Sequence, residues 1–207
     1  MALTAKKFAP KNTRWPERIF HIGRGAWLLV VVTLCFCVSD PSFAAERVRS
    51  LKEIREEGVV IQQWDTSCAA AALATVLTYT HNYPVSEQTV AQGMLRYTEP
   101  LKVRYRGGFS LLDMKRYVEG LGYRATGFRE LSFDDLVLFE GAIVPLNLHG
   151  YNHYVVFKGF KEDGDVWLGD PAFGNWTMSK DRFEEVWMDG IAFVVARNIV
   201  DDTDTTQ

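Results

Sequence analysis

A single cysteine before a run of alanines is the residue best suited to do chemistry in this sequence. Residues 62–73 read QQWDTSCAAAAL, so Cys68 follows polar residues that favour a helix start and precedes four alanines that continue the helix. The exposed N–H groups and the dipole of a helix N-terminus stabilise a thiolate, the nucleophilic form of cysteine. Cysteine is also often buried as a small hydrophobe. Cys68 is therefore either a nucleophile or an ordinary core residue.

A cysteine nucleophile needs a histidine that exchanges protons and a third group that orients the imidazole. His153 begins HYVVFKGF, a β-branched and aromatic run that predicts a strand over 153–160. The next predicted strand, 165–170, ends at Asp170, directly before a proline. If the two strands pair as antiparallel neighbours, His153 and Asp170 meet at one edge of the sheet. The sequence therefore predicts a Cys68–His153–Asp170 triad.

Attack on a carbonyl also needs hydrogen-bond donors for the oxyanion, usually a backbone N–H and a side-chain amide. Gln62, six residues before Cys68, and its neighbour Gln63 are the candidates. His149 and His153 could be considered as metal ligands, but they flank a polar turn, and no cysteine pair or carboxylate accompanies them. We therefore expect no metal and no cofactor.

Helical patterns come first along the chain and strand patterns follow. Ser110 and Asp113 form a predicted capping box, and Met114, Tyr117, Val118 and Leu121 form the apolar stripe of the helix that it begins. Other helices are expected after residues 65–67, from residue 86, over 132–139 and over 180–187. Strands are expected over 142–148, 153–160, 165–170 and 191–196. This order predicts an α+β fold, with N-terminal helices packed on a C-terminal antiparallel sheet.

Residues 1–44 have the features of an export signal. The segment carries six basic and two acidic residues, and its 13-residue apolar run, 26–38, is typical of a signal peptide and short for a membrane span. Small residues before Ala45 suit cleavage after Ala44. Because the basic segment is long, retention as a membrane anchor is the alternative. The predicted product is periplasmic or secreted, and it contacts a membrane only if the N-terminal segment is retained.

The predicted domains are the signal segment 1–44, one domain over 45–200 and a disordered tail over 201–207. Removal of the signal takes Cys35 and Cys37 with it, so Cys68 would be a single thiol that cannot form an internal disulfide. The whole chain has a net charge of −3 and the signal segment +4, which leaves −7 on the remainder. This acidic balance gives no electrostatic reason to expect a nucleic-acid partner.

The order of these motifs resembles the papain-like cysteine peptidases that process bacteriocin precursors and double-glycine leader peptides, often as domains of peptide-exporting ABC transporters. The resemblance covers about residues 59–196. The family's Q-x5-C pattern falls on Gln62 and Cys68, its H-[FY]-V-V strand begins at His153, and its D-P-A-x-G turn begins at Asp170. Where family members usually have glycine after the nucleophile, this chain has Ala69.

The resemblance implies a papain-like fold and a role for each matched residue. Cys68 would attack the peptide carbonyl, His153 would transfer protons, Asp170 would orient His153, and Gln62 would stabilise the oxyanion with the Cys68 N–H. It also implies a peptide or protein substrate, with double-glycine peptides as the expectation. The export signal and the lack of transporter domains leave the substrate open. The alternative functions are a non-catalytic peptide-binding adaptor of an export or surface-assembly system, and acyl transfer to an acceptor other than water.

Overall fold

The computed structural model describes residues 48–198, so the predicted signal segment and C-terminal tail lie outside the described residues. The helices are α2 (Leu51–Glu56), α3 (Cys68–Thr75), α4 (Glu87–Met94), α5 (Pro100–Arg106), α6 (Leu111–Gly120), α7 (Phe133–Leu136) and α8 (Lys180–Val186). A π-helical turn, η1 (Val76–Thr80), continues α3.

The strands form one antiparallel sheet in the order β1-β6-β2-β3-β4-β5. Their bounds are β1 (Tyr123–Phe128), β2 (Ile143–Leu148), β3 (Tyr151–Phe160), β4 (Val166–Asp170), β5 (Gly174–Met178) and β6 (Ala192–Arg197). The predicted α+β fold with an antiparallel sheet is confirmed.

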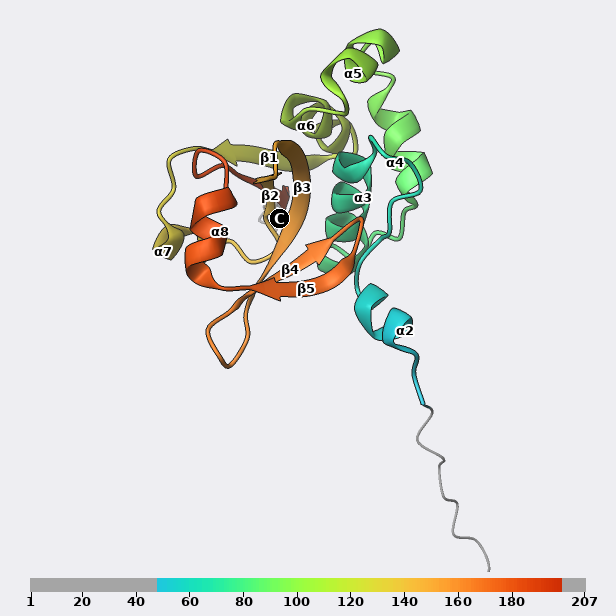
Figure 1. Cartoon of the computed structure of the whole chain (residues 1–207). Helices are drawn as coiled ribbons and strands as arrows, with labels where there is room; N and C mark the ends of the chain where they lie inside the picture. The colour runs from blue at the N-terminus through green and yellow to red at the C-terminus, as the bar shows by residue number, and fades with distance from the viewer. Residues whose placement is uncertain (1–47, 199–207) are drawn as a thin grey trace, which may run out of the picture. The chain divides into compact units, whose positions relative to one another are not determined.

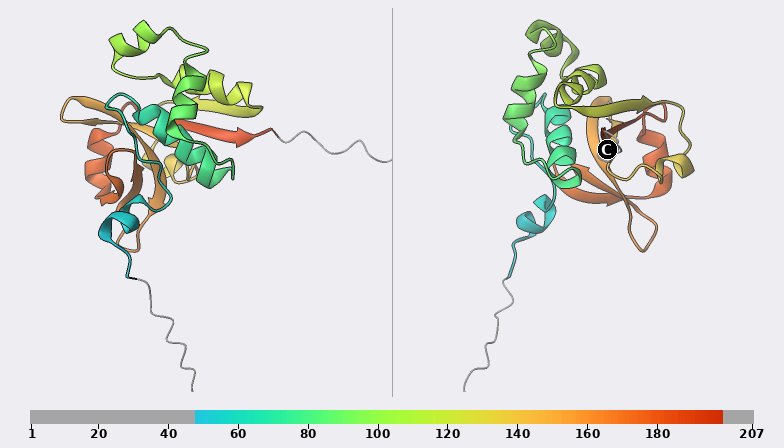
Figure 2. Two further views of the ribbon diagram at one scale, coloured as in Figure 1. Left: turned by 90° about the vertical axis from the view of Figure 1, so that its right-hand side faces the viewer. Right: turned by 180° about the vertical axis from the view of Figure 1, so that it is seen from behind.

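Successive residues of the long strand β3 contribute to two separate hydrophobic cores, as the period of a strand requires. Val156 packs with α3, α4 and α6, whereas Val155 and Phe157 pack with α7 and α8. Figures 1 and 2 show the same arrangement, with α3 and α8 on opposite sides of β3. The sheet thus separates the helix that begins at Cys68 from the helices near the C-terminus.

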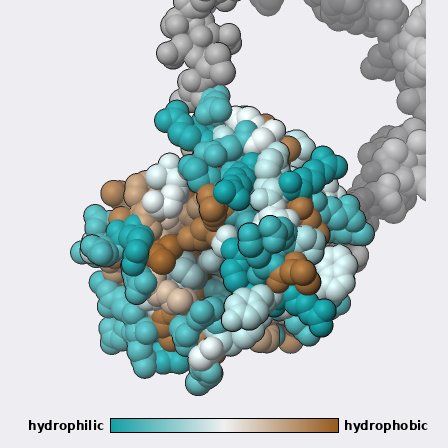
Figure 3. Space-filling model, turned by 90° about the horizontal axis from the view of Figure 1, so that it is seen from above, coloured by the Kyte–Doolittle hydropathy of each residue, from teal (hydrophilic) through white to brown (hydrophobic). Residues whose placement is uncertain are grey.

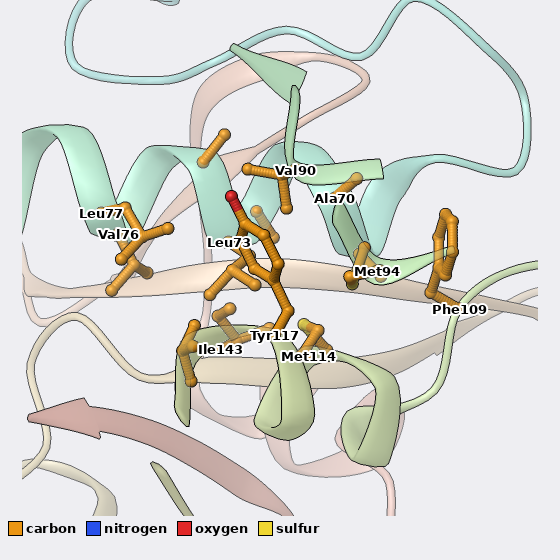
Figure 4. Packing of buried hydrophobic residues seen from close by; sticks show 14 of the residues in the cluster. Ala70, Leu73, Val76, Leu77, Val90, Met94, Phe109, Met114, Tyr117 and Ile143 are labelled. Carbon is orange, nitrogen blue, oxygen red and sulfur yellow. The ribbon is translucent and has the colours of Figure 1, made fainter. Parts of the chain in front are cut away.

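Helix α3 is the centre of the first core. All eight of its residues are buried, and its alanines add so little bulk that neighbouring elements can approach the helix closely. Figure 4 shows Leu73 of α3 among side chains from α4, α6 and β2, with the ring of Tyr117 between the helices. This burial on every side fixes α3, and with it the position of Cys68.

Four elements were not predicted, namely α2, α5, β1 and β5. Helical spacing also predicts that Thr80, Leu95 and Leu121 face the core, and this prediction is wrong. Leu95 and Leu121 lie at helix C-caps and are exposed, and Thr80 is exposed as well. Thr80 lies in η1, where the wider π-helical turn shifts the phase of the apolar stripe. The capping box of Ser110 and Asp113 is confirmed. Between residues 48 and 198, no helix is long and apolar enough to cross a membrane.

Candidate active site

His153 and Asp170 form a buried pair on adjacent strands. His153 Nε2 lies 2.8 Å from Asp170 Oδ1, and both side chains are almost fully buried. The antiparallel register of β3 and β4, in which Val156 faces Gly169, brings the start of one strand beside the end of the other. The contact predicted from the order of the strands is therefore present, although 17 residues separate its partners.

The carboxylate of Asp170 is held by several donors at once. Oδ1 also accepts from the backbone N–H groups of Ala172 (2.7 Å) and Phe173 (3.3 Å), and Oδ2 accepts from the indole N–H of Trp176 (3.2 Å). The two backbone bonds close the turn predicted by the D-P-A-x-G motif. The carboxylate therefore has a fixed orientation toward the imidazole. Trp176, which the sequence analysis did not single out, extends this network from β5.

Cys68 is the first residue of α3 and is buried, with 6% of its surface exposed. Ser67 takes the N-cap position, but its side chain does not cap the helix; its Oγ donates to the carbonyl of Trp64 at 2.6 Å. Within residues 48–198, no side chain caps the N–H groups of the first turn of α3. An uncapped helix N-terminus leaves backbone donors for an oxyanion.

The surroundings of His153 favour the protonated form of its imidazole. Burial lowers its pKa, but the hydrogen bond to Asp170 and the negative charge of Asp170, together with the nearby Cys68, outweigh burial and raise the pKa to about 9. Because Nε2 is bonded to Asp170, Nδ1 is the ring nitrogen available to the thiol. Nδ1 is buried and has no well-aligned hydrogen-bond partner among the described residues. The imidazole is thus bonded to a carboxylate through Nε2, while its buried Nδ1 could still bond to a further group.

The two glutamines have different environments. The backbone N–H of Gln62 donates to the carbonyl of Pro171 at 2.8 Å, which ties this segment to the turn after Asp170. Its side-chain Nε2 donates to the carbonyl of Trp64 at 3.1 Å, which leaves a second N–H of the amide for another acceptor. Gln62 and His153 line the same pocket. Gln63 is exposed, and its backbone N–H donates to Glu87. The structure therefore distinguishes Gln62 as the amide beside the pair.

Ala69 and the two other histidines of residues 48–198, His81 and His149, lie in environments that do not suggest a catalytic role. The side chain of Ala69 is 1% exposed and packs in the first core, so its methyl group replaces the usual glycine hydrogen within packed protein. His81 is buried and its Nε2 bonds to the carbonyl of Val195, whereas His149 is exposed in the turn between β2 and β3. Over residues 48–198 there is no cluster of three His, Cys, Asp or Glu side chains suited to a metal ion.

Comparison with known proteins gives consistent matches. Residues 56–199 match the sequence model of the peptidase C39 family. A probable functional amyloid protease, FapD, from Pseudomonas aeruginosa is 43% identical over 151 residues, and FapD from Pseudomonas fluorescens is 41% identical over 151 residues. Each alignment covers 72% of this chain and 65% of the relative, so the chain spans about two thirds of the length of these curated relatives.

Solved structures with the same fold include peptidase domains of peptide transporters. A double-glycine motif protease from an AMS/PCAT transporter, crystallised with the leader peptide, has a TM-score of 0.55 and 26% identity, over 67% of this chain and 90% of that chain. The peptidase domain of Streptococcus ComA, a bifunctional ABC transporter involved in quorum sensing, has a TM-score of 0.53 and 23% identity, over 67% of this chain and 97% of that chain.

Proposed function

Because the chain belongs to the peptidase C39 family, we propose that it is a cysteine peptidase whose nucleophile is Cys68. The observation that carries the proposal is the buried pair of His153 and Asp170, in which Asp170 and the nearby Cys68 raise the pKa of the imidazole to about 9. An imidazole with this pKa keeps its proton at neutral pH, and a neighbouring thiol that has given up its proton is a ready nucleophile.

The residues suggest one sequence of steps. The thiolate of Cys68 attacks the scissile carbonyl carbon, and the resulting oxyanion accepts from the Cys68 N–H and the free N–H of the Gln62 amide. His153 gives its proton to the leaving amine, the C–N bond breaks, and a thioester with Cys68 remains. Water then gives a proton to His153 as it attacks the thioester, and Cys68 leaves as thiolate. Asp170 holds the imidazole ring in place throughout.

We propose a peptide substrate that belongs to a secretion or surface-assembly system. Support comes from two sources: the leader peptide bound to the transporter protease of the same fold, and the functional amyloid protease relatives. Cleavage after a double-glycine motif is the first specificity to test.

We propose that residues 1–44 direct export and that residues 45–200 form the active domain. Mass spectrometry of protein recovered from the cell envelope and the medium tests this. A mature chain that begins at Ala45 supports cleavage, and a full-length chain in the membrane fraction shows the retained anchor. A full-length chain found only in the cytoplasm would overturn the export proposal.

The chemistry is tested by the alkylation rate of Cys68 as a function of pH, in the wild type and in His153→Ala. An unperturbed thiol loses reactivity below a pKa of about 8.5. We expect the wild type to react faster than His153→Ala at neutral and acid pH, because the protonated imidazole stabilises a neighbouring thiolate. A thiol that titrates in the same way in both proteins would contradict the peptidase proposal.

Cys68→Ser separates a peptidase from the binding adaptor considered above. If the protein is a peptidase, this variant loses cleavage of a peptide that it still binds. If the protein is an adaptor, the assembly process in cells continues unchanged with Cys68→Ser. The measurement pair is peptide binding in solution and complementation of the gene deletion in cells.

A further inference from the structure

A pocket of about 500 Å³ lies next to His153 and is lined mainly by residues of the sheet and its turns. It is bordered by Gln62 and His153, and the remainder of its lining comes from the β2–β3 turn, the β4–β5 turn with β5, and Arg182 of α8. None of its lining residues belongs to α3. The pocket therefore opens beside the imidazole and away from the helix that carries the nucleophile.

The lining of the pocket is mainly apolar. Its apolar side chains are Leu148, Tyr151, Ala172, Phe173, Trp176 and Met178. Phe173 and Tyr151 remain 64% and 51% exposed, which leaves their surface for contact with another molecule. Scattered apolar groups on an otherwise hydrophilic surface are also visible from above (Figure 3). Arg182 and the protonated His153 are the charged side chains of the lining, and each already has an acidic partner, Glu185 for Arg182 and Asp170 for His153. An apolar group therefore fits the pocket better than a charged one.

The direction of the substrate follows from the chemistry of the proposed triad. The acyl part becomes bonded to Cys68, so the chain on the N-terminal side of the scissile bond lies toward α3. The leaving amine must lie within hydrogen-bond reach of His153 to receive its proton. Residues on the C-terminal side of the scissile bond therefore continue past His153, toward the pocket.

We infer that this pocket is a specificity site for the residue that follows the scissile bond, and that it selects a large apolar side chain such as phenylalanine or leucine. The inference rests on the proposed function. It adds a determinant on the released segment of the substrate, separate from any motif that precedes the cleaved bond. Phe173 is the residue of choice for a test, because its side chain is exposed and only its backbone N–H bonds to Asp170.

The experiment uses the full chain and a library of peptides from a digested proteome, with cleavage sites identified by mass spectrometry. Matched peptides that differ only in the residue after the cut, with phenylalanine, leucine, alanine or aspartate, then give kcat/KM values. We expect phenylalanine and leucine to exceed alanine by about 10- to 100-fold, the range that apolar pockets supply. Aspartate should be the poorest of the four.

Phe173→Ala should lower the ratio between the phenylalanine and alanine peptides at least severalfold. Tyr105→Ala is the matched control, since Tyr105 is an aromatic residue that is 94% exposed and does not line the pocket. Cys68 alkylation in each variant reports that the active site is still formed. An unchanged ratio in Phe173→Ala, or a wild type that cuts equally before alanine and phenylalanine, would overturn the inference and leave the peptidase proposal intact. A wild type that cuts no peptide and has an ordinary thiol would overturn the proposed function itself.

Discussion

The backbone N–H of Gln63 donates to both carboxylate oxygens of Glu87, each at 3.0 Å. Glu87 is the first residue of α4 and is buried, with 3% of its surface exposed. This bond joins the segment before the nucleophile to a helix 24 residues away. Together with the bond from the Gln62 N–H to the Pro171 carbonyl, it fixes the segment that carries the Gln62 amide. Glu87 therefore acts as a positioning residue.

Replacement of Glu87 should disturb catalysis through this segment. We expect Glu87→Ala to lower the free energy of unfolding by about 1.5–3 kcal/mol, since it removes a buried charged acceptor from the Gln63 N–H. It should lower kcat by up to about 100-fold because the amide shifts, while Cys68 alkylation keeps its pH profile. Glu87→Gln keeps one acceptor and should restore most of kcat. Gln88→Ala, at the exposed neighbouring position, is the control. Equal kcat values in the wild type and Glu87→Ala would refute the positioning role.

The raised pKa of His153 predicts the alkaline limit of activity. Its pKa of about 9 means that the imidazole keeps its proton through neutral pH and loses it as the pH rises through about 9. Since the leaving amine needs this proton, kcat/KM should fall above that pH. Asp170→Asn removes a charge that raises the pKa, so the fall should begin at lower pH, and kcat/KM at neutral pH should drop on the order of 100-fold. The check is a pH–rate profile.

An exposed carboxylate provides the control for this profile. Asp163 lies in the turn between β3 and β4, so Asp163→Asn changes the net charge by the same amount and leaves the His153–Asp170 pair intact. Its profile should overlay that of the wild type. If both variants shift the alkaline limit equally, then net charge and not the contact with His153 controls the pKa.

Gly174 ends the D-P-A-x-G turn in a left-handed conformation, with φ of +76°. A Cβ at this position would overlap the backbone carbonyl of Arg55, which belongs to α2. Gly164 also has a positive φ, +87°, but a Cβ there meets no atom within 4 Å. The pair of alanine variants therefore separates backbone strain from steric overlap.

We expect Gly164→Ala to cost about 1–2 kcal/mol of stability, the usual penalty for the left-handed region. Gly174→Ala should cost about 1–3 kcal/mol more because it also forces two backbones apart. It should lower kcat as well, since the same turn holds Asp170. Chemical denaturation of the two variants measures the difference. Equal losses of stability would mean that α2 moves away without cost.

The sequence predicted the elements whose signals are local. The Ser110 capping box, the start of α3 at Cys68 and the strands β2 to β4 all have such signals. It did not predict α5, in which Val103 is the sole buried residue, or α2, which has none, because neither presents an apolar stripe. The sequence GNWTM of β5 is short and largely polar, and it forms a strand because β4 pairs with it.

The candidate site shows the same limit. The contact of His153 with Asp170 could be predicted because two consecutive strands with a short connection usually pair as neighbours. The bonds of Glu87 with Gln63 and of Trp176 with Asp170 could not. They depend on how α4 and β5 pack, and the sequence near Glu87 or Trp176 contains no motif that indicates a partner. Residue type and proximity to Cys68 did not separate Gln62 from Gln63, and only the resemblance to the family favoured Gln62.

Substitution of each glutamine tests the distinction that the structure makes between them. Gln62→Ala removes the amide that shares a pocket with His153, and it should lower kcat by about 100- to 1,000-fold, the usual cost of one oxyanion donor. Cys68 alkylation should remain fast, because the thiolate does not depend on this amide. Gln63→Ala keeps the backbone bond to Glu87 and should change kcat less than about twofold. If the two variants lose activity equally, the glutamines act by holding the segment in place, and the oxyanion must be stabilised by the backbone N–H groups of α3.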